Sequence, residues 1–242
     1  MKLVNMAMAL NTLLLLSCGG GGGGTGVTGS STIYPLSTIL ANYVNNPFTV
    51  QVTIAGSLSS GGQIASISGS GSQSESTSNS TFGGVSALQK KQIVAGIMSV
   101  NLNGQTQSAP LNGITYYYFN TNYQTLGKTT SEGQYCVTTN TSSIPMNVTP
   151  GQSGDWYKMN CYTNSSRAVL VATLSVSYSV EAVSENTANL IINLATLDSS
   201  TKINLPTKET YLITTSGSIS YKESSANISS GGETLTLVIK TK

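Results

Sequence analysis

Apolar residues recur with two different spacings along this chain, and the spacing changes at Phe48. Before that point they follow the three- and four-residue spacing that places side chains on one face of an α-helix. The residues on this face are Leu36, Ile39, Leu40, Tyr43 and Val44. Pro35 suits the first position of a helix, and Pro47 ends one because the residue before a proline avoids helical geometry. The pattern therefore predicts one short helix over residues 35–45.

From Phe48 onward the apolar positions repeat every second residue, which is typical of strands with one buried face. The expected strands cover residues 48–54, 64–71, 92–102, 105–109, 114–120, 133–140, 156–163, 167–183, 187–197, 202–214, 217–223 and 233–241. Asn103-Gly104 is the strongest turn signal between them, because this pair suits a two-residue hairpin loop. Residues 68–81 are almost entirely Ser, Gly, Thr, Asn and Gln, and their pattern fits a frayed edge strand or a loop.

The order of these segments indicates how the sheet is connected. No helical segment separates successive strands, so a parallel sheet with crossover helices is not expected. The alternating run over residues 167–183 is long enough to bend across two sheets or to wrap around a barrel. We predict an all-β domain, an antiparallel meander that curls into a barrel or a two-layer sandwich, with one short N-terminal helix. A division into two sub-sheets near residues 120–130 stays open.

The amino terminus has the pattern of a secretory signal. Lys2 precedes a mostly apolar run over residues 3–16, which is shorter than the roughly 20 residues of a transmembrane helix. The stretch Leu15-Leu16-Ser17-Cys18 resembles the lipobox of bacterial lipoproteins. That resemblance implies that Cys18 is alkylated by diacylglycerol, becomes the first residue after cleavage, and is then acylated, for example with palmitate. An ordinary signal peptide that ends in Cys is the alternative.

Six glycines, residues 19–24, follow Cys18 and favour the lipoprotein interpretation, because an anchored domain needs a flexible tether. The expected organisation is a signal peptide over 1–17, the lipidated Cys18 and a tether over 18–32, and the β domain over 33–242. We predict that the protein associates with a membrane through the lipid on Cys18. By resemblance to proteobacterial lipoproteins, Gly19 in place of Asp favours the outer membrane, so the expected location is the cell envelope.

Composition narrows the classes of function. Charged residues make up 8% of the chain, far below the roughly one quarter of average globular proteins, so Ser, Thr, Asn and Gln must supply the polar surface. Arg167 is the single arginine and no basic stripe occurs, so no nucleic-acid partner is expected. The chain has no histidine, which removes Ser-His-Asp and Cys-His catalysis, and nothing selects a pair of carboxylates. We expect no enzyme activity, no cofactor and no metal.

Two cysteines remain once Cys18 carries lipid, and both lie in expected strands. Cys136 and Cys161 would meet an oxidising compartment beyond the inner membrane, so we predict a disulfide between them. Such a bridge would add about 3–4 kcal/mol of stability in the chain-entropy model. Two free buried thiols are the alternative.

Aromatic residues concentrate between positions 116 and 162. A candidate binding surface for a sugar or a peptide consists of Tyr116, Tyr117, Tyr118, Tyr123 and Trp156. Packing in the core or at a barrel edge is the alternative, because Tyr is a common strand residue. Successive strand residues face opposite sides of a sheet, so we expect the three adjacent tyrosines to divide between two faces, with at least one exposed.

The chain after the tether is also similar to a group of β-rich lipoproteins of proteobacteria. The similarity lies in the helix before Pro47 and in the segments 81–84, 116–118, 122–127 and 150–154, and it covers most of the mature chain with loose motifs. It implies a fold and a location, since no catalytic residue set comes with the group. We expect a lipid-anchored envelope protein that is structural or binds a partner, either an envelope protein or a glycan. A periplasmic barrel that binds a small ligand or a lipid is the alternative.

Overall fold

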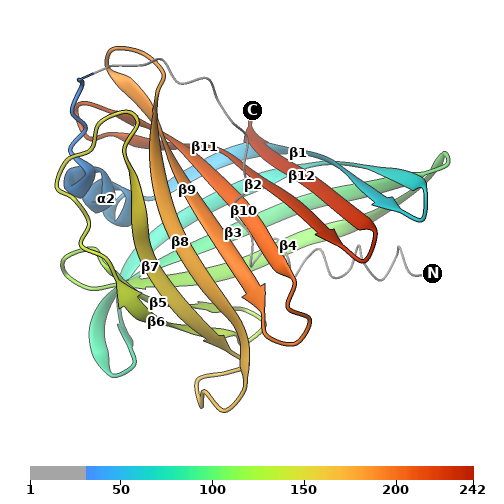
Figure 1. Cartoon of the computed structure of the whole chain (residues 1–242), viewed down its shortest axis with the longest axis horizontal. Coiled ribbons are helices and arrows are strands. Elements are labelled where there is room, and N and C mark those ends of the chain that lie inside the picture. Colours follow the sequence, from blue (N-terminus) through green and yellow to red (C-terminus); the bar gives the residue numbers. More distant parts are fainter. Residues whose placement is uncertain (1–30) are drawn as a thin grey trace.

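The computed structural model describes residues 31–242, which form a closed barrel of twelve antiparallel strands with one helix (Figure 1). Each strand pairs with the next along the chain, and β1 pairs with β12 to close the barrel. The elements are α2 (Leu36–Asn45), β1 (Phe48–Ser60), β2 (Gln63–Phe82), β3 (Val85–Leu102), β4 (Gln105–Phe119), β5 (Thr125–Thr130), β6 (Tyr135–Thr141), β7 (Ser153–Tyr162), β8 (Leu170–Ala182), β9 (Thr187–Asp198), β10 (Asn204–Thr214), β11 (Ile219–Ser230) and β12 (Glu233–Thr241). The predicted all-β fold and the predicted helix are confirmed, and the sheet is a barrel. Residues 1–30, with the predicted signal, Cys18 and most of the tether, lie outside the described residues.

Apolar side chains face the inside of the barrel and small polar side chains face outward. Along β1, Val52 and Ile54 are buried, whereas Gln51 and Thr53 next to them are exposed. On β8 every buried residue lies on one face, and Leu170 at the start of that face is exposed. This alternation follows from the two-residue period of a strand, and it is the reverse of the pattern along strands whose outer face contacts lipid.

Several strands are longer than their apolar pattern indicated. The undecided residues 68–81 belong to the 20-residue strand β2, whose backbone pairs with both β1 and β3. Strand β4 continues through Pro110, which is paired with Ile97, so the expected interruption between 109 and 114 does not exist. Backbone ladders hold these segments, although they carry little apolar signal: residues 68–75 pair with both β1 and β3, whereas residues 76–81 and 109–114 have ladder partners in β3 alone.

No division into two sub-sheets occurs near 120–130. Strand β5, which the sequence pattern missed, follows β4 after a short turn, and the two strands pair from Thr115–Thr130 to Phe119–Thr125. Strand β5 is short and contains Gly127 and Lys128, and its alternation is too brief to stand out from the turns around it. The sheet therefore runs without a break through this region.

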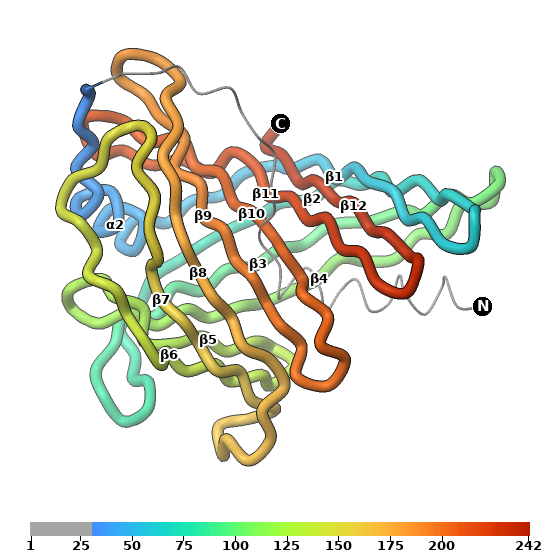
Figure 2. Tube along the Cα trace, in the orientation of Figure 1, coloured from blue at the N-terminus to red at the C-terminus, as the bar shows by residue number. Residues whose placement is uncertain are grey.

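The barrel is longer on one side than on the other. The hairpins β1–β2, β3–β4 and β11–β12 project from one end, and α2 lies at the opposite end (Figure 2). The inner face of α2 is buried against the barrel core through Leu36, Ile39, Leu40 and Val44. Tyr34, just before the helix, exchanges two backbone hydrogen bonds of 2.8 and 2.9 Å with Val148 in the β6–β7 loop. The helix thus closes one end of the barrel and is tied to its rim.

The predicted disulfide is present. Cys136 on β6 and Cys161 on β7 are register partners with their Cα atoms 3.9 Å apart, and both side chains point into the barrel. The chain between the two strands, residues 142–152, leaves the sheet and returns, as expected from its two prolines. The bridge therefore joins the two strands that bracket the longest loop of the described chain, at the ends of these strands that lie away from that loop.

Candidate functional site

A pocket of about 70 Å³ lies inside the barrel beneath α2. Seven aromatic side chains line it, from the helix and from three parts of the wall: Tyr43, Tyr117, Phe119, Tyr123, Trp156, Tyr157 and Tyr211. Aliphatic residues of β9 and the carboxylate of Glu209 on β10 complete the lining. Small-ligand sites typically combine such an apolar concave surface with a few polar groups.

Local backbone features bring these aromatic residues to one place. Tyr117 and Phe119 are alternate residues of β4 and so share its inner face. Tyr123 lies in the β4–β5 turn with a φ of 60°, and its hydroxyl accepts a 3.1 Å hydrogen bond from Asn45 at the end of α2. The register of β7 shifts between Asp155 and Tyr157, and this bulge lets the consecutive Trp156 and Tyr157 both reach the pocket.

Tyr43 and Tyr211 form the side of the pocket nearest the helix. Their rings meet edge to face with centroids 5.6 Å apart, and the Tyr211 hydroxyl donates a 2.8 Å hydrogen bond to Oε2 of Glu209. The pKa of Tyr43 is raised well above its ordinary value, first by loss of solvent and then by the negative charges of Glu75 and Glu209. Tyr43 is therefore a neutral hydroxyl over the whole physiological range.

A buried ion pair lies next to the pocket. Nζ of Lys90 on β3 is 2.9 Å from Oε2 of Glu75 on β2, and both side chains are fully buried. Nζ also donates a 3.2 Å hydrogen bond to the carbonyl of Asn46, the C-cap of α2, and lies 4.6 Å from the centroid of the Tyr43 ring. Oε1 of Glu75 accepts a 2.9 Å hydrogen bond from Gln92. The two charges satisfy each other and fix the end of the helix that carries Tyr43.

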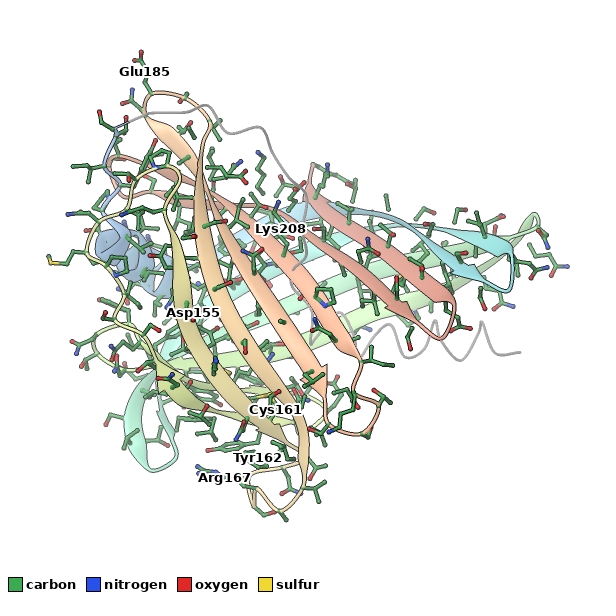
Figure 3. The ribbon with its side chains drawn as sticks, viewed as in Figure 1. Asp155, Cys161, Tyr162, Arg167, Glu185 and Lys208 are labelled. Carbon is green, nitrogen blue, oxygen red and sulfur yellow. A yellow bond between two sulfur atoms is a disulfide. The ribbon has the colours of Figure 1, made fainter. Side chains whose placement is uncertain are left out.

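A second group of aromatic residues lies on the outer face of the barrel. The ring of Phe82, at the tip of the β2–β3 hairpin, stacks on Tyr118 with centroids 4.6 Å apart and on Tyr135 at 5.0 Å. Gly127 leaves room for this ring, because a Cβ there would lie 2.3 Å from it. Arg167, in the turn between β7 and β8 (Figure 3), places its guanidinium carbon 5.6 Å from the Tyr135 ring centroid. Phe82 therefore closes this outer cluster.

The predicted aromatic surface is divided between these two places and is not one surface. Tyr117, Tyr123 and Trp156 line the inner pocket, whereas Tyr116 and Tyr118 face outward. The expected split of the three adjacent tyrosines is confirmed, because they alternate across the wall. None of the three is fully exposed: Tyr118 is 8% exposed beneath Phe82, and Tyr116 and Tyr117 are half-buried. The expected exposed tyrosine is not found because Phe82, at the tip of the β2–β3 hairpin, folds over the outward face of Tyr118, and the sequence did not show this contact.

The sequence pattern also missed residues of the pocket. The pattern places Tyr43 only on the buried face of the helix and Glu209 only within the expected strand 202–214. Glu75 lay in a Ser-rich segment whose structure was undecided. Their common signal is position: Glu75 falls on the same face of β2 as Ala65 and Ile67, and Glu209 on the same face of β10 as Tyr211 and Ile213. A charged residue in phase with buried neighbours is the pattern that would have found them.

The wall beside the pocket is weakly paired. Ladder pairs join β9 and β10 at Asn204–Pro206 with Ala195–Leu197 and again at Thr214 with Thr187, and the ladder is interrupted in between without a change of register. A hollow of about 290 Å³ borders this stretch and shares Tyr157 and Leu194 with the aromatic pocket. Asp155 on β7 lines this hollow. Strands β8 and β9 separate β7 from β10, on which Lys208 is labelled (Figure 3). The hollow thus adjoins the pocket through Tyr157 and Leu194.

Over residues 31–242 no group of three or more acidic or Cys side chains is arranged to hold a metal ion. No helix in that same part of the chain is long and apolar enough to cross a membrane. Compared with models of protein families, with curated proteins and with solved structures, the chain matches none.

Proposed function

We propose that this chain is a lipid-anchored, non-enzymatic protein of the cell envelope whose barrel binds a small ligand in the aromatic pocket beneath α2. The observation that carries the binding role is the convergence of seven aromatic side chains and one carboxylate on a single interior pocket. The anchoring role rests on Leu15-Leu16-Ser17-Cys18 and the glycines that follow.

The size of the pocket sets the size of the ligand. Its volume of about 70 Å³, and an adjoining hollow of about 140 Å³ that shares Tyr43, Tyr211 and Ile219, suit a small molecule or a small group of a larger one. A whole acyl chain would need the core residues inside the barrel to move apart. A small ligand is therefore better supported than a lipid.

The outer aromatic cluster supports a partner-binding role less well. Phe82 covers the ring faces of Tyr118 and Tyr135 with which a sugar or a peptide would stack. The cluster instead attaches the β2–β3 hairpin to the outside of β4, β5 and β6. A role in holding the barrel together accounts for its contacts without a partner.

Native mass spectrometry of the lipidated protein in a mild detergent tests the binding role. We expect a small molecule to be released from the wild type, and to be absent from Leu190→Trp, which fills the pocket from β9. Ile97→Trp, on the outer face of β3, is the matched control and should retain the molecule, because Ile97 is 60% exposed. A wild-type protein that neither carries a small molecule nor is stabilised by any member of a metabolite library would contradict the proposal.

Metabolic labelling tests the anchor separately. Cells given an alkyne fatty acid should label the wild type and Cys136→Ala, but not Cys18→Ala, because acylation needs the cysteine of the lipobox. Equal labelling of Cys18→Ala and wild type would refute lipid attachment at this residue. The binding role would not be affected by that result.

A further inference from the structure

The two ends of the barrel differ in charge. Successive strands are antiparallel, so the connections between them lie alternately at the end closed by α2 and at the opposite end. The α2 end is formed by residues 31–47 and by the connections 83–84, 120–124, 142–152, 183–186 and 215–218. Glu185 is the single charged residue in these segments of the described chain. The turns and adjoining strand ends at the opposite end carry Glu132, Arg167, Asp198, Lys202 and Glu233.

Three large apolar side chains project from the α2 end: Ile33 is 58% exposed, Met146 is 74% exposed and Val183 is 51% exposed. Hydrogen bonds hold their segments side by side. The hydroxyl of Thr32 donates a 3.1 Å bond to the carbonyl of Glu185 in the β8–β9 turn (Figure 3), and the backbone N–H of Ser37 donates a 3.2 Å bond to the carbonyl of Met146. Ile33, Met146 and Val183 thus belong to neighbouring segments of one rim, and we call them the rim patch.

The chain reaches the rim patch directly from the predicted anchor. Residues 19–30 separate Cys18 from Ser31, and even a fully extended link of this length spans only about 45 Å. The 20-residue strand β2 runs about 65 Å along its own length, and the hairpins of the opposite end project away from α2 (Figure 2). A lipid on Cys18 would therefore bring the rim patch to the membrane surface more readily than the hairpins.

Apolar side chains are exposed at the opposite end too, among them Ile64, Val169 and Leu197. That end also carries three carboxylates, and moving a charged group out of water into an apolar boundary is costly. The exposed residues of α2, by contrast, are Ser37, Thr38 and Asn45, which are uncharged. Charge and exposed apolar area therefore both favour the α2 end as the surface that meets lipid.

We propose that the α2 end of the barrel rests on the membrane that holds the lipid of Cys18, with Ile33, Met146 and Val183 inserted among the lipid headgroups. This inference rests on the proposed anchor and adds an orientation to it. Apolar side chains bind the bilayer boundary in proportion to the area they bury. Because the anchor already holds the barrel close to the surface, these three side chains need only select which end faces it. The aromatic pocket beneath α2 then lies on the membrane side of the barrel.

Fluorescent labels at the two ends test this orientation. An added cysteine can be labelled alone, because Cys136 and Cys161 form a disulfide and Cys18 would carry lipid. Met146→Cys in the rim patch and Ile64→Cys beside the β1–β2 turn are each coupled to nitrobenzoxadiazole in the full lipidated protein. The proteins are reconstituted on vesicles of phosphatidylcholine and phosphatidylethanolamine that contain nitroxide-labelled phosphatidylcholine. We expect quenching at residue 146 to be at least about twofold stronger than at residue 64, because interfacial side chains lie about 5–10 Å deep in the headgroup boundary.

A reporter outside the rim patch tests whether the patch is responsible. The label is placed on Thr38→Cys, on the exposed face of α2. Combining Ile33→Asn, Met146→Asn and Val183→Asn should lower its quenching by at least about half, because the apolar area that enters the boundary is lost. The matched control combines Ile64→Asn, Val169→Asn and Leu197→Asn at the opposite end and should leave the quenching unchanged.

Equal quenching at residues 146 and 64, stronger quenching at residue 64, or a Thr38 reporter that does not respond to the rim-patch variant would each overturn the inference. The comparison of the two single labels decides the matter even where a triple variant fails to fold. Flotation with the vesicles separates this failure from failure of the anchor. A protein that does not float refutes the anchor and the orientation together, whereas a protein that floats with equally quenched labels keeps its anchor and has no preferred orientation.

Discussion

Lys90 connects three parts of the molecule at a single atom. Its Nζ pairs with Glu75 on the neighbouring strand, bonds to the carbonyl that ends α2 and lies over the ring of Tyr43. A buried charge is tolerated only where its partners replace the water it has lost, and these three contacts take that place here. The residue therefore couples the helix to the wall of the barrel.

Replacing Lys90 by Met should lower the free energy of unfolding by about 3–5 kcal/mol, because it leaves the carboxylate of Glu75 buried without its counter-ion. The double variant Glu75→Gln and Lys90→Met should lose less than the sum of the two single variants. Denaturant titration of all four proteins measures this coupling. Lys91→Met changes the next residue, which faces outward, and should cost little. Additive losses would show that the pair does not act as a unit.

Asp198 makes the stability of the folded state depend on pH in a direction that its pKa determines. In the β9–β10 turn its Oδ1 accepts hydrogen bonds from the backbone and hydroxyl groups of Thr201 and Ser200, which lower its pKa to about 2. The pKa in the unfolded chain is about 3.9, so the folded state binds this proton less readily. The stabilisation is thus complete above about pH 4 and is lost as the pH falls through 2.

Asp198→Asn should therefore melt at a lower temperature than the wild type near neutral pH, and the two melting temperatures should converge as the pH falls from 4 to 2. Thermal unfolding followed by circular dichroism at a series of pH values measures the difference. A gap between the two proteins that does not change with pH would contradict the assigned cause.

The roles of single residues could be predicted where they follow from residue type or from alternation along one strand. They could not be predicted where they depend on contacts between distant parts of the chain. Cys136 and Cys161 followed from counting cysteines in an oxidising compartment, and Tyr117 could be assigned to the opposite face from Tyr118 by alternation alone. Glu209 and Tyr43 could not be brought together, because their contact depends on how a helix near the start of the chain enters a barrel whose tenth strand supplies Glu209.

At the scale of elements, α2 acts as a closure for one end of the barrel. Ile39 is fully buried in the core, and Leu40 and Val44 continue the same face into the lining of the pocket. These helical side chains pack in one core cluster with buried residues of the strands. Loss of one of them creates a cavity at the junction between helix and barrel.

Ile39→Ala should cost about 2–5 kcal/mol of stability, as is typical for large-to-small changes in a core. Thr38→Ala, one residue earlier and exposed, is the matched control and should cost much less. Denaturant titration compares the two. Similar losses in both variants would mean that the helix is not held by its inner face.

The disulfide stabilises the strands on either side of the 142–152 loop. Cys136→Ser, combined with Cys161→Ser to avoid a lone thiol, should lower stability by about 3–4 kcal/mol, because the unfolded chain regains the freedom of a loop closed over 25 residues. Reductant should lower the melting temperature of the wild type and leave that of the double variant unchanged. An equal effect of reductant on both proteins would point to some other cause.

Elements were predictable where side chains determine them. The helix and the strands from β6 to β12 have clear apolar periods, and their expected positions agree with the structure apart from their ends and from β11, which extends seven residues beyond its expected end at residue 223. Strand β2 is different: its outward residues from Ser66 to Ser80 and its glycines carry little apolar signal, and the strand exists because β1 and β3 pair with it on both sides. This strand is therefore determined by its pairing with neighbouring strands and not by its own side-chain pattern.

At the scale of the whole molecule, the sequence allowed a barrel or a sandwich, and the choice depended on one contact. A meander of hairpins contains only local pairings, and either architecture can follow from it. The pairing of β1 with β12, from Val52–Thr241 to Ser59–Thr234, is what makes the structure a barrel. No local pattern announces that pairing, because both strands alternate as any edge strand would.

That closing ladder also orders the events of folding. Every other ladder joins strands that follow each other along the chain, so eleven pairings can form as hairpins, whereas the twelfth must wait until the last strand has emerged. Until then β1 and β12 are open edges that can pair with another chain. Contacts between residues far apart in sequence also form slowly, since the loop must close before the pairing repays it. The β1–β12 junction is therefore where assembly competes with aggregation, and a chaperone that covers either edge would protect the unfinished barrel.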